Sequence, residues 1–268
     1  MTQHFFKRNI NIAICAIIIS ILSALTATVL VIIWATKKDV SNGYLGGLNW
    51  DDSIFNWHPI LMVLSFSLCF LLGILSFRID RNLLDRNHKK CLHLILMFIA
   101  LIGGSIGIYT AYKSHQVPTD DNLYYGNLDT LHSWIGLGAI IAFAQNAILG
   151  VLYFVMPLFT ISVKTDYKKF HIIFGISSFV LVLLANVTGI MEMNTWNECT
   201  YFTTNIDNDP SQNYNKLAEG CHLSNWIALL LILSTLMCLI GIGYFQKYEE
   251  MKFMLKENEN TLQEPLLQ

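Results

Sequence analysis

Charge is scarce in this 268-residue chain: Asp, Glu, Lys and Arg make up 13% of it, whereas a soluble domain usually carries about 25%. The hydrophobic fraction is 54%, and 16 Phe and 11 Tyr are present, which excludes a disordered chain. A basic surplus is also missing, because 17 Lys and Arg face 19 Asp and Glu. Nucleic-acid binding is therefore not expected. The shortage of charge indicates a protein whose surroundings are lipid.

Six apolar stretches are each long enough to cross a hydrocarbon core of about 30 Å, which takes about 20 helical residues. Backbone polar groups must be satisfied inside the bilayer, so these stretches are predicted to be helices. The first is too long for a signal peptide and lacks a clear cleavage site. The predicted fold class is an all-α membrane protein with a short N-terminus (1–9), one membrane domain (10–246) and a tail (247–268) that begins as a short helix. The expected spans are Ile10–Trp34, Trp57–Phe77, Leu92–Tyr112, Leu131–Met156, Phe170–Met191 and Leu223–Phe245.

The distribution of charge predicts the orientation of these spans. With the N-terminus placed inside, 13 of the 17 Lys and Arg lie on the inner side. Positive charge gathers on the cytosolic side of membrane proteins, so both termini of this multi-pass chain are predicted to be cytosolic. The outer face then carries −7 and the inner face +5. Cys199 and Cys221 bracket the outer loop between the fifth and sixth spans, where a disulfide is compatible with an oxidising compartment.

Four of the eight histidines lie near the ends of the apolar stretches, two at each depth. His58 and His132 stand at the outer ends of the second and fourth spans, and His93 and His171 at the inner starts of the third and fifth. Ionisable side chains in membrane helices are rare and usually face the bundle interior as functional groups. Facing imidazoles at two levels suit two haem irons with both axial positions filled.

Glycines one turn from two of these histidines support the same interpretation. Gly136 follows His132 by four residues and Gly175 follows His171 by four. Residues four apart share a helix face, so each missing side chain leaves room for the edge of a macrocycle. For Gly103 and Gly107 the expected role is close helix packing.

Histidines at these positions could also serve uses other than haem ligation. Zinc prefers about four ligands close together, which pairs at opposite ends of a bilayer cannot supply. A proton or metal transporter without haem stays open as an alternative, although it predicts broken helices at mid-membrane, and Pro59 and Pro157 lie near helix ends. A haem-binding sensor without turnover is a further alternative.

Four motifs follow one another on successive spans: Phe-Asn-Trp-His-Pro (55–59), Lys-x-x-His (90–93), Leu-His-Ser-Trp-x-Gly (131–136) and His-x-x-x-Gly (171–175). In this order they resemble the cytochrome b561 family, over about Gly43 to Glu192. The resemblance implies a four-helix core made by the second to fifth spans, two b-type haems, and electron transfer from cytosolic ascorbate. It also implies His58 with His132 on the outer haem and His93 with His171 on the inner one.

The resemblance implies further sites on the inner side. Arg78 lies beside the inner haem, and Lys247 contacts it. Ascorbate meets Arg86, Lys90 and Lys164. Arg86 stands where the family usually has Lys, and Lys164 where it usually has Arg. Because Lys cannot offer the flat bidentate fork of Arg, the departure at Lys164 concerns how the donor is held.

On the outer side, the resemblance implies a haem lining and an acceptor position. Asp129 replaces a Tyr of the family and adds negative charge, and Glu192 closes the outer haem site. His115 occupies a loop position where some relatives have a histidine at the acceptor site. The segment that lines the outer haem is Asn127, Leu128, Asp129 and Thr130.

The function predicted from these features is that of a transmembrane oxidoreductase. One electron passes from ascorbate to the inner haem, then to the outer haem and on to an acceptor. Ferric iron and monodehydroascorbate are the two acceptor candidates, and an outer face at −7 favours a cation. The other expected partner is the lipid bilayer; homodimerisation is an expectation from the resemblance alone.

Overall fold

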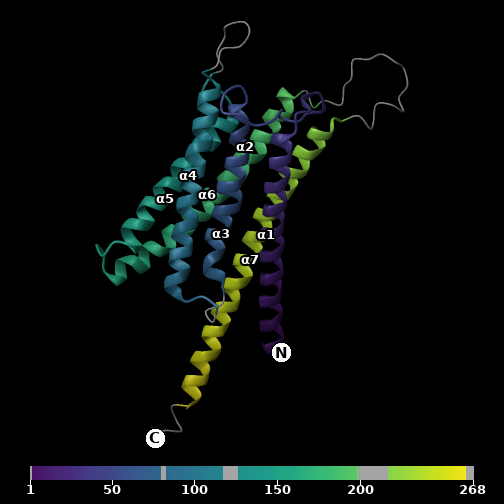
Figure 1. The fold of residues 1–268 in the computed structure, drawn as a ribbon. Coiled ribbons are helices and arrows are strands. Elements are labelled where there is room, and N and C mark those ends of the chain that lie inside the picture. The colour runs from purple at the N-terminus through teal and green to yellow at the C-terminus, as the bar shows by residue number, and fades with distance from the viewer. Residues whose placement is uncertain (1, 80–82, 117–125, 198, 200–216, 264–268) are drawn as a thin grey trace.

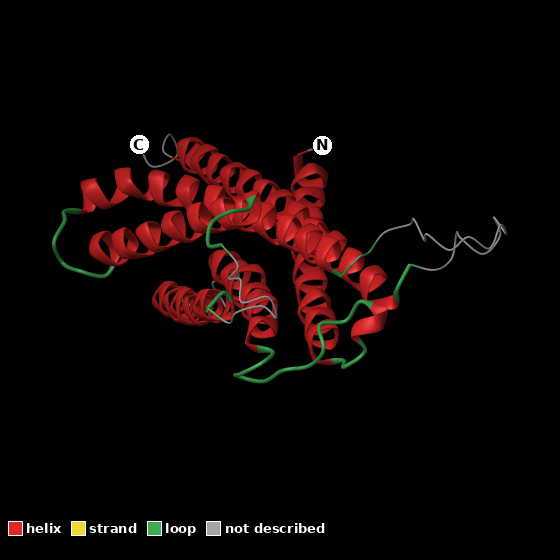
Figure 2. Cartoon of the chain, turned by 90° about the horizontal axis from the view of Figure 1, so that it is seen from above, coloured by secondary structure: helices red, strands yellow, loops and turns green. Residues whose placement is uncertain are grey.

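The computed structural model describes residues 2–79, 83–116, 126–197, 199 and 217–263; Met1 and the last five residues of the predicted tail lie outside the described residues. Within these ranges every regular element is a helix (Figure 2). Six helical stretches are long and apolar enough to span a membrane, so the six predicted spans are confirmed. The long helices are α1 (Thr2–Thr36), α4 (Arg86–Ser114), α5 (Leu131–Phe154), α6 (Ile161–Trp196) and α7 (Glu219–Gln263).

Several helices extend beyond the apolar stretches. The fifth span, expected from Phe170, begins at Ile161, directly after Thr160, so that its first turns carry lysines. The sixth continues without a break to Gln263, so the helix expected at the start of the tail forms the last turns of α7. No Gly or Pro interrupts the sequence from Tyr244 to Gln263, and side-chain pairs such as Gln246 with Glu250 (3.1 Å) support the helix four residues apart.

The second span is not one continuous α-helix, which differs from the expectation for Trp57–Phe77. It consists of α2 (Trp57–Met62), a π-helical segment η3 (Val63–Cys69), α3 (Phe70–Leu75) and a final 3-10 turn η4 (Ser76–Arg78). The backbone N–H of Phe70 bonds to the carbonyl of Ser65, five residues back. A π-helical turn adds one residue to an α-helix without ending it.

The second span (α2–η3–α3) packs along α4, α5 packs along α6, and α1 packs along α7 (Figure 1). In that last pair Ser20 Oγ donates to the Ser234 carbonyl (2.7 Å) and Ser234 Oγ donates to the Ser20 carbonyl (2.9 Å). These reciprocal bonds satisfy two buried hydroxyl groups within the bilayer, where water is not available as a partner. Large apolar side chains such as Ile95, Ile141 and Ile173 remain exposed and face the lipid.

Aromatic side chains fill the middle of the bundle between η3–α3, α5 and α6. Phe70 meets Phe143 edge-on with ring centroids 4.8 Å apart, and meets Phe179 at 5.4 Å. Phe66 contacts Phe143 at 5.1 Å. All four rings are buried. Such edge-to-face contacts hold the second span (η3–α3) against α5 and α6 at mid-depth.

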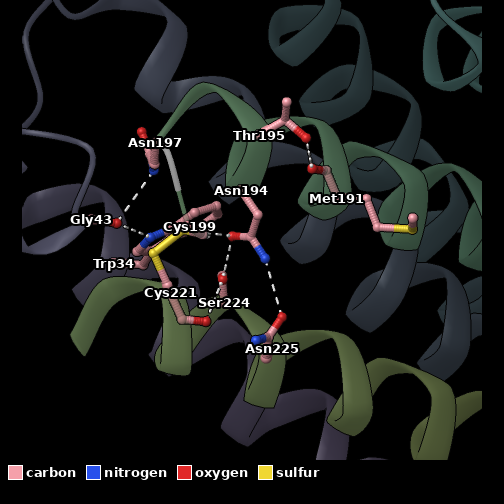
Figure 3. Close-up of a disulfide and its surroundings, with 10 residues drawn as sticks. All are labelled: Trp34, Gly43, Met191, Asn194, Thr195, Asn197, Cys199, Cys221, Ser224 and Asn225. Atoms are coloured by element: carbon pink, nitrogen blue, oxygen red, sulfur yellow. Dashed lines mark hydrogen bonds between the residues drawn. A yellow bond between two sulfur atoms is a disulfide. The ribbon is translucent and has the colours of Figure 1, made fainter. Parts of the chain in front are cut away.

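A disulfide joins Cys199 to Cys221 at the end predicted to be the outer one, with Cα atoms 5.8 Å apart, so the pairing that the sequence left open is made (Figure 3). Around it, Asn197 Nδ2 and Trp34 Nε1 both donate to the carbonyl of Gly43. Gly43 has φ of +79° and lies against Cys221, so a side chain there would be both strained and obstructed. The outer ends of α1, α6 and α7 are therefore tied together.

Candidate functional site

The outer histidine pair lies between two helices that are distant in sequence. His58 comes from the first turn of α2 and His132 from the first turn of α5, and their ring centroids are 6.0 Å apart at an interplanar angle of 85°. His58 Nδ1–H donates to the Gly107 carbonyl (2.9 Å) and His132 Nδ1–H to the Ala185 carbonyl (2.8 Å). In that tautomer Nε2 of each ring is unprotonated and available as a ligand.

The inner pair repeats this arrangement at the other end of the bundle. The rings of His93 on α4 and His171 on α6 have centroids 6.2 Å apart at 71°. His93 Nδ1–H donates to the Gly73 carbonyl (2.8 Å). His171 is different, because its Nδ1 is buried and has no hydrogen-bond partner among the described residues. Phe77 and Phe154 pack against the two rings, each at 5.3 Å.

The two pairs are related by a regular spacing along the helices. Gly107 lies fourteen residues after His93, and Ala185 fourteen after His171, so each bonded carbonyl marks the level of the opposite pair. Fourteen residues correspond to about 21 Å along an α-helix. Gly73 lies fifteen residues after His58, one residue more than the spacing of fourteen on α4 and α6. The extra residue is absorbed by η3, which keeps His58 and Gly73 on one face; without it, one residue would turn them apart by about 100°.

The separation of the rings fits a single metal between them. A metal bonded at about 2 Å to the Nε2 atoms of two facing imidazoles places the ring centroids about 6 Å apart. In the described part of the chain, no three side chains of His, Cys, Asp or Glu converge to hold an ion. The candidate sites are therefore two-ligand sites, one at each level, and the remaining coordination positions of a metal would need a planar macrocycle.

The basic residues predicted to meet the donor lie at the end of the molecule where α4 and α6 begin (Figure 1). Arg86 and Lys90 are exposed on the first turns of α4. Lys164 is half-buried, and its Nζ donates to the Met156 carbonyl (3.4 Å). The structure thus places all three at one end but shows no direct contact between them.

Two residues next to this basic group, Lys89 and Asp85, stabilise the start of α4. Lys89 is buried and donates to the carbonyl of Ile79, which ties the end of the second span to α4. Asp85 caps α4 by accepting from the His88 backbone N–H (2.8 Å) and from the His88 ring (2.7 Å). Those two bonds hold the pKa of the Asp85 carboxyl below its usual value.

Arg78 and Lys247 were predicted to lie beside the inner site. The Arg78 guanidinium carbon lies 5.2 Å from the ring centroid of Phe245 on α7, and its Nε is buried without a hydrogen-bond partner among the described residues. Arg78 Nε and the ring nitrogen of His171 are the two such buried atoms in the described chain, and both belong to residues assigned to the inner site. Lys247 is exposed and lines a shallow cavity along α7 with Gly243 and Tyr244.

The residues predicted around the outer site are brought together in two contacts. Thr130 Oγ1 donates to Glu192 Oε2 (3.1 Å), which links the start of α5 to the end of α6. His115 Nδ1–H donates to Asn127 Oδ1 (3.1 Å). Leu128 has φ of +60°, which is uncommon for a residue with a side chain and marks local strain. Asp129 is exposed beside them.

Comparison with known proteins identifies the chain's relatives. The family model described as eukaryotic cytochrome b561 matches residues 57–197, which include all four paired histidines. The chain belongs to this family. A maize (Zea mays) protein named ascorbate-specific transmembrane electron transporter 2 is 32% identical over 216 residues, 78% of this chain and 80% of its own length.

Other relatives carry names for related activities. The Arabidopsis thaliana transmembrane ascorbate ferrireductase 1 is 31% identical over 65% of this chain and 70% of its own length. A cattle (Bos taurus) lysosomal membrane ascorbate-dependent ferrireductase, CYB561A3, is 26% identical over 72% of this chain and 69% of its own length. Membership of the cytochrome b561 family implies that the macrocycle is haem b.

For a cytochrome b561, the glycines near the histidines can be compared with expectation. A Cβ at Gly136 would meet nothing within 4 Å, so space is open there, whereas at Gly175 it would lie 3.3 Å from the Asn146 amide nitrogen. Close packing is confirmed for Gly103, which faces Ser65, and for Gly107, which faces Leu61 and Met62.

Two further glycines of this cytochrome b561 were not singled out from the sequence. A Cβ at Gly189 would lie 2.8 Å from the His132 ring, and a Cβ at Gly150 would lie 2.9 Å from the His171 ring. Each follows the histidine of its own helix by eighteen residues and touches the histidine of the other helix. That shared spacing is the signal that could have found them.

Proposed function

We propose that this cytochrome b561 carries electrons across a membrane from cytosolic ascorbate, through two b-type haems, to a one-electron acceptor on the outer side. The observation that carries the proposal is the presence of two facing imidazole pairs at two depths, with centroids 6.0 and 6.2 Å apart. Three of the four rings already have Nδ1–H bonded to a backbone carbonyl, which leaves Nε2 for iron.

His58 and His132 would hold the outer haem, and His93 and His171 the inner one. A haem held by two imidazoles would supply one-electron redox chemistry. The protein's share of the work is to hold the rings, exclude water and tune the sites through burial and nearby charge. Arg78, with its buried and unpartnered Nε, offers a cation to a carboxylate at the inner site.

On the inner side, Arg86, Lys90 and Lys164 would bind the ascorbate anion. Both termini are proposed to be cytosolic, because α1 begins and α7 continues at the end of the molecule that carries these residues (Figure 1) and positive charge gathers on the cytosolic side. Loss of one electron and one proton converts ascorbate to its radical. The electron is the part that crosses the membrane.

On the outer side, Asn127, Leu128, Asp129 and Thr130 would line the haem, and Glu192 would hold this segment through its bond to Thr130. Ferric iron is the acceptor that we favour, with monodehydroascorbate as the alternative. The exposed Asp129 and an outer face at −7 attract cations. His115, bonded to Asn127 beside this segment, would meet the acceptor.

The test is to purify the chain in detergent, measure haem per chain and record spectra before and after adding ascorbate. The expected result is two b-type haems, reduced by ascorbate and reoxidised by ferric iron faster than by monodehydroascorbate. A protein that stays colourless after expression with ample haem refutes the proposal and favours a histidine-based transporter. Faster reoxidation by the radical refutes the choice of acceptor.

A further inference from the structure

The inner site lacks one member of an otherwise regular set of contacts. Each bonded carbonyl lies fourteen residues after the histidine of its own helix, or fifteen across η3. On α5, the residue fourteen after His132 is Asn146, so its carbonyl is the partner that the pattern assigns to His171. That bond is not made, because His171 Nδ1 is buried without a partner among the described residues.

The side chain of Asn146 makes a different contact at the same place. Its Nδ2 donates to the backbone carbonyl of His171 (3.2 Å), so the amide holds the backbone of the ligand residue instead of its ring. Gly175 leaves the room for this contact, since a Cβ there would lie 3.3 Å from Nδ2. An amide inside a membrane helix is costly unless it is hydrogen-bonded, which favours the bond to α6.

The corresponding position in the outer site has no such group. Ala185 accepts the His132 ring N–H through its carbonyl and has only a methyl side chain. The two sites therefore secure equivalent ligands in different ways: His132 through its ring, and His171 through its backbone.

We propose that Asn146 is a positioning residue for the inner haem ligand His171. This inference rests on the proposed function and deepens it. Asn146 fixes where the α6 backbone presents the imidazole, while the ring keeps the freedom to turn toward iron. Removing the amide donor then affects the inner haem and leaves the outer haem unchanged.

The test compares Asn146→Leu and Asn146→Ala, which both lack the donor but differ in volume, with Asn146→Gln, which keeps an amide. Asn186→Leu is the matched control. The side-chain amide of Asn186 also donates a hydrogen bond between helices, to Ser67 Oγ (2.8 Å), but Ser67 is not a ligand residue. The readouts are haem per chain and the low-temperature electron paramagnetic resonance (EPR) spectrum of the ferric protein. His93→Ala identifies the inner signal by removing it.

Both donor-lacking variants should lose half or more of the inner signal, so that haem per chain falls from two toward one. The outer signal should remain, Asn146→Gln should recover the inner one, and Asn186→Leu should keep both. Two haems with an unchanged inner signal in Asn146→Leu refute the inference, as does an equal loss in Asn186→Leu. A wild-type chain without haem refutes the proposed function itself, which distinguishes the two failures.

Discussion

Replacing Gly189 by Ala is the sharpest perturbation of the outer site, because the added methyl would meet a ligand ring. Ala in place of Gly in a helix interior ordinarily stabilises by about 0.5–1 kcal/mol. At Gly189 the new Cβ would lie 2.8 Å from Cε1 and 2.9 Å from Nδ1 of His132. These distances are well inside van der Waals contact, so the ring must move.

The cost of that movement can be worked out from the contacts. Overpacking of this kind costs about 1–3 kcal/mol. Displacing the ring also breaks the bond from His132 to the Ala185 carbonyl (2.8 Å), and such a bond contributes about 0.5–1.5 kcal/mol. Even after the gain in helix propensity, Gly189→Ala should weaken the outer site by roughly 0.5–4 kcal/mol. At about 1.4 kcal/mol for each factor of ten, haem affinity there should fall by a factor between about two and several hundred.

Haem titration of the purified variant measures the effect, with the EPR spectrum showing which haem is lost. Gly138→Ala is the control, because a Cβ there would meet nothing within 4 Å and Gly138, six residues after His132, lies on a different face of α5 from the ligand. We expect Gly189→Ala to retain the inner haem and lose outer-site occupancy, and Gly138→Ala to bind two haems. Full occupancy with an unchanged outer signal in Gly189→Ala would show that the ring does not need this glycine, and the reasoning would be wrong.

Three other changes test separate parts of the structure. Gly136→Ala adds a methyl to open space one turn from His132. The melting temperature of the haem-free chain should stay unchanged or rise, whereas outer haem occupancy in a titration should fall. Unchanged occupancy would place the macrocycle elsewhere. Cys199→Ser opens a link between residues 22 apart and should destabilise by roughly 3 kcal/mol, seen as a lower melting temperature that wild type matches only in reductant. The pKa of Asp85 is lowered by its bonds to His88 from an ordinary value of 3.8, so its cap is complete above that pH and is lost as the pH falls through the lowered pKa. The protection factors of the amides in the first turn of α4, which divide out the intrinsic pH dependence of exchange, should therefore fall in acid in wild type and stay level in Asp85→Asn, which keeps a good capping residue; equal acid dependence in both would contradict this.

The overall fold and the histidine pairs could be predicted because they depend on quantities that a sequence contains. A run of apolar residues fixes where a span lies, and the rise per residue fixes the depth of each histidine along it. His58 and His132 therefore had to share one level, and His93 and His171 another. Helix ends were less predictable, because α6 and α7 extend into charged sequence that is helical for reasons other than hydrophobicity.

The details that the sequence could not supply depend on how helices face one another. A π-helical turn such as η3 lies within an uninterrupted apolar run, and nothing in its composition distinguishes it from α-helix. In the sequence, nothing distinguishes Gly150 and Gly189 from other small residues in a helix. Their contact with the histidine rings depends on how α5 and α6 pack side by side. Likewise, the missing partner of His171 becomes visible only against the three bonds that the other histidines make.

The disulfide at the outer end stands on the side where electrons are proposed to leave the protein. Structural disulfides in secreted proteins usually have reduction potentials below about −300 mV, which makes them resistant even to glutathione. Ascorbate is a weaker reductant than glutathione, so a structural disulfide of this class between Cys199 and Cys221 is expected to stay closed while ascorbate donates electrons. Under the proposed function, reducing equivalents would leave next to this cross-link without undoing it, and turnover would not alter the architecture of that end of the protein.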